Sequence, residues 1–219
     1  MMPDLSVYLV TDVAQSAAAG RDLVDTVLAA VRGGVTTVQL RAKDAEAADM
    51  LQLAEELARR LPTHVDVLVN DRVDVYLAAR ARGARVAGVH IGQRDLPPVA
   101  VREMVGPDAV IGLSASSRAQ IAEAASGAGR VTYLGIGAVH QTSSKPDAPP
   151  VLGIAAAGHL ASVSSLPAVA IGGVTPEDVP ALRAAGFAGA AVVSWICAAP
   201  DARAAAAELA RAWATPEHR

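Results

Sequence analysis

The sequence predicts a single (β/α)8 barrel with parallel strands, the TIM-barrel architecture, in one domain that spans residues 1–219. Short β-branched or apolar runs alternate with longer segments of helical spacing, and this alternation is typical of βα units around a parallel sheet. Eight such units of about 25 residues each fill the chain and leave no second domain. A doubly wound open sheet is the alternative arrangement.

The predicted strands are short apolar runs bounded by Gly, Pro or charged residues: Val7–Val10, Thr36–Leu40, Val67–Asn70, Ala87–Ile91, Val110–Ser114, Val131–Ile136, Ala168–Ile171 and Gly189–Val193. Helical spacing predicts the helices between them: Asp22–Arg32, Ala45–Leu61, Val73–Ala81, Pro98–Val105, Arg118–Ala125, Ile154–Ser162, Pro176–Ala185 and Ala202–Ala214. Glycines such as Gly83 and Gly186 follow these helices, where a left-handed C-cap ends a helix.

The composition excludes several classes of protein. The formal charge is −3 and aromatic residues make up 3% of the chain, so neither a basic surface nor stacking rings indicate a nucleic-acid partner. No run approaches the roughly 18 apolar residues of a membrane span, and the N-terminus does not resemble a secretory signal. We therefore expect a cytoplasmic protein without membrane contact. The lone Cys197 excludes an intramolecular disulfide and a Cys-rich zinc site, and no feature indicates an oligomeric state.

Polar residues follow several predicted strands, at the end of the barrel where parallel βα barrels carry their active sites. The second strand runs into Gln39, Arg41 and Lys43, which strand alternation places on one side. An amide donor and two cations suit a phosphate or pyrophosphate group. A solvated strand end that is basic by chance is the alternative interpretation.

Two aspartates follow neighbouring strands, Asp71 after the third and Asp95 after the fourth. Carboxylate oxygens, completed by phosphate oxygens and water, are the usual ligands of Mg²⁺ in proteins. Each aspartate could instead be a helix N-cap, Asp71 for the helix that starts near Val73 and Asp95 for the one near Pro98. The pair beside a basic strand end favours the metal.

The longest irregular segment, residues 137–153 after the sixth strand, is predicted to form part of the active site, because long loops in compact domains are usually functional. Its Thr142–Lys145 run combines small hydroxyls with one cation, which suits an anion. Gly172–Gly173 and Ser194 follow strands seven and eight, where barrels commonly bind a phosphate monoester. The residues thus predict two anion sites with a metal beside one of them.

Other candidates for chemistry are weaker. The five histidines have no metal-ligand spacing, and we expect His90 in the barrel wall. Ser116 or Ser117 is expected to be the N-cap of the helix after the fifth strand. No nucleophile elbow, P-loop or dinucleotide fingerprint occurs, so hydrolase, NTPase and NAD-dependent functions lack their specific motifs.

Seven segments, in order and at the expected strand ends, resemble the thiamine-phosphate synthase family: Tyr8–Asp12, Gln39–Lys43, Val69–Asp71, His90–Asp95, Thr142–Lys145, Ile171–Val174 and Val193–Ser194. That family consists of TIM barrels that join 4-amino-5-hydroxymethyl-2-methylpyrimidine pyrophosphate to a thiazole phosphate and release pyrophosphate with the help of Mg²⁺. The resemblance implies that this chain is a Mg²⁺-dependent transferase of thiamine biosynthesis, acting on these two small molecules.

The resemblance also implies roles for particular residues. Asp71 and Asp95 would hold Mg²⁺, and the expected catalytic residues are Arg41, Lys43, Ser114 and Lys145. The expected substrate-binding residues are Gln39, Leu40, Arg41, Ala42, Lys43, Asn70, Ser114, Thr142, Ser143, Ser144, Lys145, Gly173, Val193 and Ser194. In the implied mechanism pyrophosphate leaves first, so neutralisation of the leaving group and positioning supply most of the catalysis.

Three residues depart from the family pattern. Ala138 stands where a proline is usual, His140 takes an often aromatic position, and Trp195 follows Ser194 where a small residue is common. The Trp195 indole either narrows the thiazole-phosphate pocket or turns outward. Two other functions stay open: a thiazole tautomerase, which shares the fold but uses a histidine after strand five and lacks the metal aspartates, and a non-catalytic phosphate-binding barrel.

Overall fold

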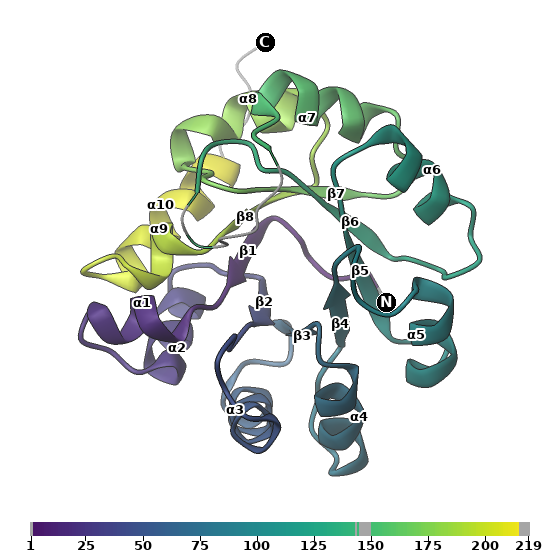
Figure 1. Cartoon of the computed structure of the whole chain (residues 1–219). Coiled ribbons are helices and arrows are strands. Elements are labelled where there is room, and N and C mark those ends of the chain that lie inside the picture. Colours follow the sequence, from purple (N-terminus) through teal and green to yellow (C-terminus); the bar gives the residue numbers. More distant parts are fainter. Residues whose placement is uncertain (1, 143, 145–149, 215–219) are drawn as a thin grey trace.

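A computed structural model of the protein describes residues 2–142, 144 and 150–214 of the 219-residue chain. Its eight strands are parallel and form a closed barrel in sequence order. Closure occurs because β1 (Val7–Val10) pairs with β2 (Thr37–Leu40) on one side and with β8 (Gly189–Val192) on the other. Helices surround the strands (Figure 1). The predicted (β/α)8 fold is confirmed, and the open sheet is excluded.

The other strands agree with the predicted runs to within two residues at each end: β3 Asp66–Asn70, β4 Gly88–Ile91, β5 Val110–Ala115, β6 Tyr133–Ile136 and β7 Ala168–Ile171. Nearly every strand residue is buried, because one face of each strand packs inside the barrel and the other packs under the helices. Continuous apolar runs are therefore the expected sequence pattern of these strands.

The main helices also lie where helical spacing places them: α2 Leu23–Arg32, α3 Ala47–Arg60, α4 Val73–Ala81, α5 Pro98–Val105, α6 Arg118–Ala125, α7 Gly153–Ser162 and α10 Ala202–Ala214. The predicted Pro176–Ala185 helix begins as a 3-10 turn, η1 Pro176–Asp178, and continues as α8 Val179–Ala184. Two short helices are not predicted, α1 Val13–Ala18 and α9 Ser194–Cys197. Helices of one or two turns show too little periodicity to be recognised in a sequence.

The barrel has two apolar cores. The larger core lies between the strands and the surrounding helices, and α3 contributes Met50, Ala54, Leu57 and Ala58 from one face. A smaller core fills the barrel itself with side chains from several strands: Leu5, Tyr8, Val10, Leu68, Val110, Tyr133, Val169 and Ala191. The inner core closes the barrel below its carboxyl end and so provides a floor for any site above it.

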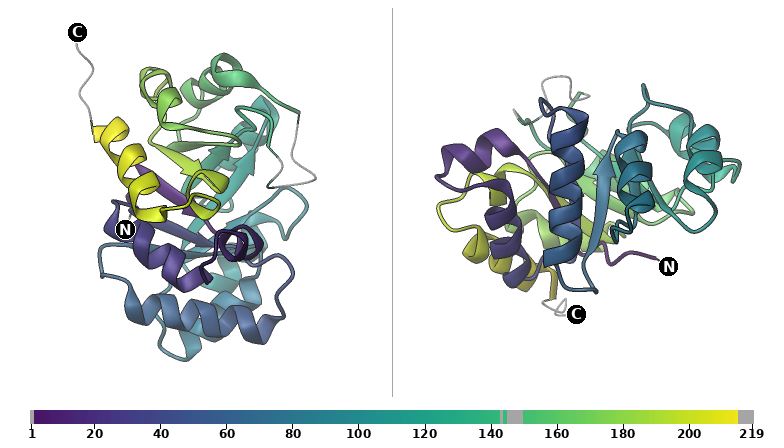
Figure 2. Two further views of the ribbon diagram at one scale, coloured as in Figure 1. Left: turned by 90° about the vertical axis from the view of Figure 1, so that its left-hand side faces the viewer. Right: turned by 90° about the horizontal axis from the view of Figure 1, so that it is seen from below.

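The helices cover the outside of the barrel on the sides seen in two further views (Figure 2). Within the described part of the chain, no helix has the length and apolar character needed to cross a membrane.

Candidate active site

A cavity of about 600 Å³ lies at the carboxyl end of the barrel, and residues from the ends of all eight strands line it. It brings together most of the predicted site residues: Gln39, Arg41, Ala42, Lys43, Asn70, Asp71, Asp95, Ser114, Thr142, Ser144, Gly173, Val193 and Ser194. Leu40 is not among the lining residues, because its side chain is fully buried in the core between strands and helices. Ser143 and Lys145 lie outside the described residues.

Arg41 and Lys43 supply positive charge to this cavity from the loop after β2. The Arg41 backbone is fixed by Thr11, whose hydroxyl accepts from the Arg41 N–H at 2.8 Å and donates to the Arg41 carbonyl at 2.9 Å. Asp12 Oδ2 lies 3.6 Å from Arg41 Nη1, while Asp12 Oδ1 accepts the Gln15 N–H and caps α1. The unpredicted helix α1 thus positions a predicted anion-binding side chain.

Asp71 and Asp95 both line the cavity. Asp71 has a backbone φ of 59°, and its carboxylate accepts from the Asn70 amide at 2.7 Å. Asp95 Oδ2 accepts from the Gly92 N–H at 2.6 Å, which closes the loop after β4. Neither aspartate caps a helix, because the N-caps of α4 and α5 are Arg72 and Pro97. The helix-cap interpretation of both residues was therefore wrong.

These two carboxylates fit an Mg²⁺ ion that receives its remaining ligands from elsewhere. Carboxylate oxygens are the donors that Mg²⁺ prefers, and the ion usually keeps several water or phosphate ligands. Over residues 2–142, 144 and 150–214 no cluster of three His, Cys, Asp or Glu side chains occurs that would complete a metal shell. The donor set suits a metal bound together with a phosphorylated substrate.

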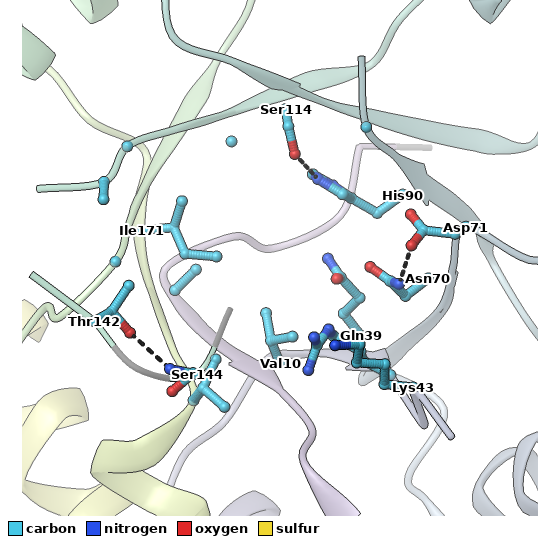
Figure 3. Close-up of a pocket in the computed structure, with 18 of the residues that line it drawn as sticks. Val10, Gln39, Lys43, Asn70, Asp71, His90, Ser114, Thr142, Ser144 and Ile171 are labelled. Atoms are coloured by element: carbon cyan, nitrogen blue, oxygen red, sulfur yellow. Dashed lines mark hydrogen bonds between the residues drawn. The ribbon is translucent and has the colours of Figure 1, made fainter. Parts of the chain in front are cut away.

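The Thr142 and Ser144 hydroxyls lie on the opposite side of the cavity from Asp71 (Figure 3). Thr142 Oγ1 accepts from the Ser144 N–H at 3.2 Å, and the Gln15 amide donates to Ser144 Oγ at 3.2 Å. The loop after β7 passes close to the loop after β6. A Cβ at Gly173, where φ is 67°, would lie 2.8 Å from His140 Cβ. A glycine is needed there for both reasons.

The floor of the cavity contains a residue that sequence reasoning assigned only to the barrel wall. His90 is on β4, and its side chain points inward, with Nε2 3.0 Å from Ser114 Oγ and Nδ1 2.8 Å from the Tyr133 hydroxyl. Burial raises the pKa of Tyr8 and of Tyr133 above the ordinary value of 10.0, so both phenols keep their protons.

Further lining residues were not predicted: Arg72, Gln93, Arg94, Gln120 and Trp195. Gln93 and Arg94 could have been found, because they stand directly before Asp95 at a strand end. Gln120 follows Ser117, which is the N-cap of α6 as expected and accepts the Gln120 N–H. Gln120 was missed because a residue one helical turn beyond an N-cap shows no pattern that marks it as part of a site.

The three departures from the family pattern have defined places. Trp195 lines the cavity, but its indole donates its N–H to the Ala205 carbonyl of α10 at 3.1 Å and packs against the outer core, so the indole points away from the middle of the cavity. His140 Nε2 lies 2.9 Å from Asp178 Oδ1, which joins the loop after β6 to η1. The peptide bond between Gly137 and Ala138 is cis.

A family model described as thiamine monophosphate synthase matches residues 7–196 of the chain. The chain belongs to this family. The match spans every strand of the barrel and the loops that carry the cavity. The family resemblance found in the sequence is thereby confirmed.

Individual members of the thiamine monophosphate synthase family are similar over nearly the whole length. A thiamine-phosphate synthase of Azorhizobium caulinodans is 45% identical over 207 residues, which are 94% of this chain and 93% of that protein. One of Corynebacterium efficiens is 40% identical over 199 residues, covering 91% and 90%. The solved thiamine phosphate pyrophosphorylase of Pyrococcus furiosus has a TM-score of 0.83 at 29% identity and covers 96% of both chains.

Proposed function

We propose that this chain joins 4-amino-5-hydroxymethyl-2-methylpyrimidine pyrophosphate to thiazole phosphate and forms thiamine phosphate. One observation carries the proposal: a single cavity in a thiamine monophosphate synthase barrel is lined by the cations Arg41 and Lys43 and by two carboxylates, with the Thr142 and Ser144 hydroxyls across from Asp71. The first group suits a pyrophosphate with its metal, and the second suits a phosphate monoester. The two substrates would therefore meet in the middle of the cavity.

The reaction needs little from the protein beyond charge and position. The C–O bond to pyrophosphate breaks, and pyrophosphate leaves with the electron pair. The electron-rich aminopyrimidine stabilises the methylene cation, and the thiazole nitrogen then forms the new C–N bond. Arg41 and Lys43 would stabilise the departing charge, and Lys145, a prediction from the family resemblance, would add a third cation. Holding both substrates in one cavity supplies the orientation.

Asp71 and Asp95 would hold Mg²⁺ together with the pyrophosphate oxygens. The bound metal would neutralise charge on the leaving group as a Lewis acid. Asn70 keeps the Asp71 carboxylate in place through its amide, and the Gly92 N–H does the same for Asp95. Both carboxylates are therefore oriented before substrate arrives.

The deciding experiment measures thiamine phosphate formation by the purified protein with both substrates, with and without Mg²⁺. We expect turnover only with Mg²⁺ and a loss of about 10²-fold or more in kcat for Asp71→Asn and Asp95→Asn, because the metal that would neutralise the leaving group would no longer be held. Asp49→Asn is the matched control, since Asp49 is exposed on α3 and does not line the cavity. Unchanged Mg²⁺ dependence in both variants would contradict the metal assignment.

The same assay separates the other two functions. Isomerisation of the thiazole without any pyrimidine substrate would indicate the tautomerase, but the end of β5 and the loop after it carry serines at 114, 116 and 117 and no histidine. Thiazole phosphate that binds in calorimetry and never reacts would indicate a non-catalytic barrel. The outward Trp195 weighs against that function, because its indole is held on α10. The cytoplasmic location stays a prediction.

A further inference from the structure

Five polar side chains form one continuous chain of hydrogen bonds across the floor of the cavity. Gln39 Nε2 lies 2.8 Å from the Tyr8 hydroxyl, which lies 2.6 Å from the Tyr133 hydroxyl. The Tyr133 hydroxyl lies 2.8 Å from His90 Nδ1, and His90 Nε2 lies 3.0 Å from Ser114 Oγ. The first and last members, Gln39 and Ser114, both line the cavity.

The barrel makes room for this chain by omitting side chains. A Cβ at Gly112 of β5 would lie 2.3 Å from the Tyr133 hydroxyl and 2.5 Å from His90 Nδ1, so it would occupy the path of the hydrogen bond between them. A Cβ at Gly135 of β6 would lie 3.2 Å from His90 Cε1. The two glycines therefore permit the imidazole and the phenol to meet across β5.

The direction in which each hydrogen bond of this network is donated follows from the donors and acceptors that each side chain has. The Gln39 amide N–H donates to the Tyr8 oxygen, and the only acceptor for the Tyr8 hydrogen among the described residues is the Tyr133 oxygen. The Tyr133 hydrogen then goes to His90 Nδ1, which leaves the imidazole proton on Nε2. Nε2–H donates to Ser114 Oγ. All four bonds thus run from Gln39 toward Ser114.

This direction of donation determines which donor and which acceptor Ser114 and Gln39, at the two ends of the network, present to a ligand. Ser114 Oγ accepts from His90 and has no other hydrogen-bond partner in the described ranges, so its own hydrogen is available to the cavity. The Gln39 amide uses its N–H within the chain, so its carbonyl oxygen is available as an acceptor. A ring that carries an exocyclic amino donor and a ring-nitrogen acceptor matches this pattern, and an aminopyrimidine is such a ring.

We propose that His90 is a positioning residue, held by Tyr133 in the Nε2–H tautomer so that Ser114 donates its hydrogen to a ring nitrogen of the aminopyrimidine. The inference rests on the proposed function and adds a role for the buried side chains Tyr8, Tyr133 and His90. Neither tyrosine lines the cavity, so both act only through their neighbours. Burial of both phenols keeps them protonated and hence able to donate.

The tautomer is tested on the wild-type protein without any variant. A neutron crystal structure of the unliganded protein should show the imidazole hydrogen of His90 on Nε2 and none on Nδ1. Hydrogen on Nδ1 would mean that the chain runs in the opposite direction, with Ser114 donating to His90, and would overturn the proposal. This result does not depend on turnover, so it is independent of the proposed function.

Two substitutions of His90 separate positioning from packing. In His90→Gln the side-chain amide reaches the region of Nε2 and can still donate to Ser114, whereas in His90→Asn it reaches only the region of Nδ1. We expect His90→Gln to keep kcat/KM for the pyrimidine substrate within a few-fold and His90→Asn to lose about tenfold, the effect of one hydrogen bond. The KM for thiazole phosphate should be unchanged in both. Equal losses in the two variants would contradict a role through Ser114.

A double-mutant cycle tests the dependence on Ser114 directly. In a Ser114→Ala background His90→Asn should change kcat/KM for the pyrimidine substrate by less than about twofold, because the contact through which it acts is already absent. Additive losses would show that His90 acts by another route. Tyr133→Phe should resemble His90→Asn, and Tyr76→Phe is its matched control, since Tyr76 is buried on α4 away from the cavity. A wild-type protein without synthase activity would refute the proposed function instead.

Discussion

The surroundings of the cavity residue Arg41 come from the loop after β1. Thr11 holds its backbone and Asp12 lies beside its guanidinium, with both side chains of the ion pair about 15% exposed. A partly buried pair loses less to solvent screening than a surface pair. Asp12 therefore restricts where the Arg41 charge can go before a ligand binds.

We expect Asp12→Asn to raise the KM for the pyrimidine substrate about fivefold, or roughly 1 kcal/mol, because the guanidinium loses its partner. Asparagine is as good an N-cap as aspartate, so α1 should stay intact. Asp22→Asn is the control, because Asp22 caps α2 in the same way and makes no contact with Arg41. Steady-state kinetics of the three proteins check this, and an equal effect in both variants would assign the change to helix capping.

Trp195 gives a second prediction for a single residue. Its indole packs on the outer core and donates to the Ala205 carbonyl, so Trp195→Ala should lower the free energy of unfolding by about 2 kcal/mol. The KM for thiazole phosphate should hardly change, because the side chain is held away from the middle of the cavity. Urea unfolding and calorimetric titration measure the two quantities. Thiazole phosphate that binds more than about tenfold tighter to the variant would show that the indole blocks the pocket.

Among the elements, β5 makes room for side chains of both neighbouring strands. Gly112 faces the inside of the barrel, where Tyr133 and His90 approach from β6 and β4. Large side chains fill most of a barrel interior, so each one needs a neighbour that is small enough. β5 thus pairs with β4 and β6 and, at Gly112, also leaves the space in which the His90 and Tyr133 side chains meet.

Gly112→Ala should lower the free energy of unfolding by about 1 to 3 kcal/mol, because the methyl group overpacks the interior. Gly135→Ala is a graded control on β6, since its Cβ would lie 3.2 Å from His90 rather than 2.3 Å from Tyr133. We expect a clearly smaller loss from it. Denaturant unfolding of both variants provides the comparison, and equal losses would mean that strand geometry, not the clash, determines the cost.

At the scale of the whole molecule, the barrel closes where β8 and α9, near the end of the chain, meet β1. Cys197 at the end of α9 lies against β1, with Sγ 3.8 Å from the Val10 carbonyl, and its side chain is fully buried. Burial raises the pKa of the Cys197 thiol from 9.0 to about 11. The thiol titrates only when this closure opens or the pH becomes strongly alkaline.

Burial of the Cys197 thiol therefore makes the free energy of unfolding depend on pH. Between pH 9.0 and about 11 the folded thiol keeps its proton while the unfolded one loses it, so stability falls as the pH rises. Cys197→Ala removes this contribution, and its free energy of unfolding should fall less steeply, by at most about 1.4 kcal/mol per pH unit. Urea unfolding across this range measures both slopes. The buried tyrosines contribute equally to the pH dependence of both proteins. Equal slopes of unfolding free energy against pH would therefore show that the fold does not keep the Cys197 thiol protonated.

The sequence alone was enough to predict the elements and the end of the barrel that carries the site. Strand and helix runs follow from local periodicity, and closure of eight parallel strands brings their carboxyl ends together whatever the details of packing. That is why Arg41, Asp71, Ser114 and Thr142 were expected at the same end of the barrel. The short helices α1 and α9 gave no periodic signal and were missed.

Only the tertiary structure decided which side chains touch. Tyr8 and Tyr133 are 125 residues apart in the sequence, and their hydroxyls meet because both point into a barrel that lacks a side chain at Gly112. Leu40 and Gln39 are neighbours in one strand, yet Leu40 is buried under the helices and Gln39 faces the cavity. Periodicity places a residue on a strand, but its contacts depend on the volume left by residues far away in the sequence, and that volume exists only once the barrel has closed.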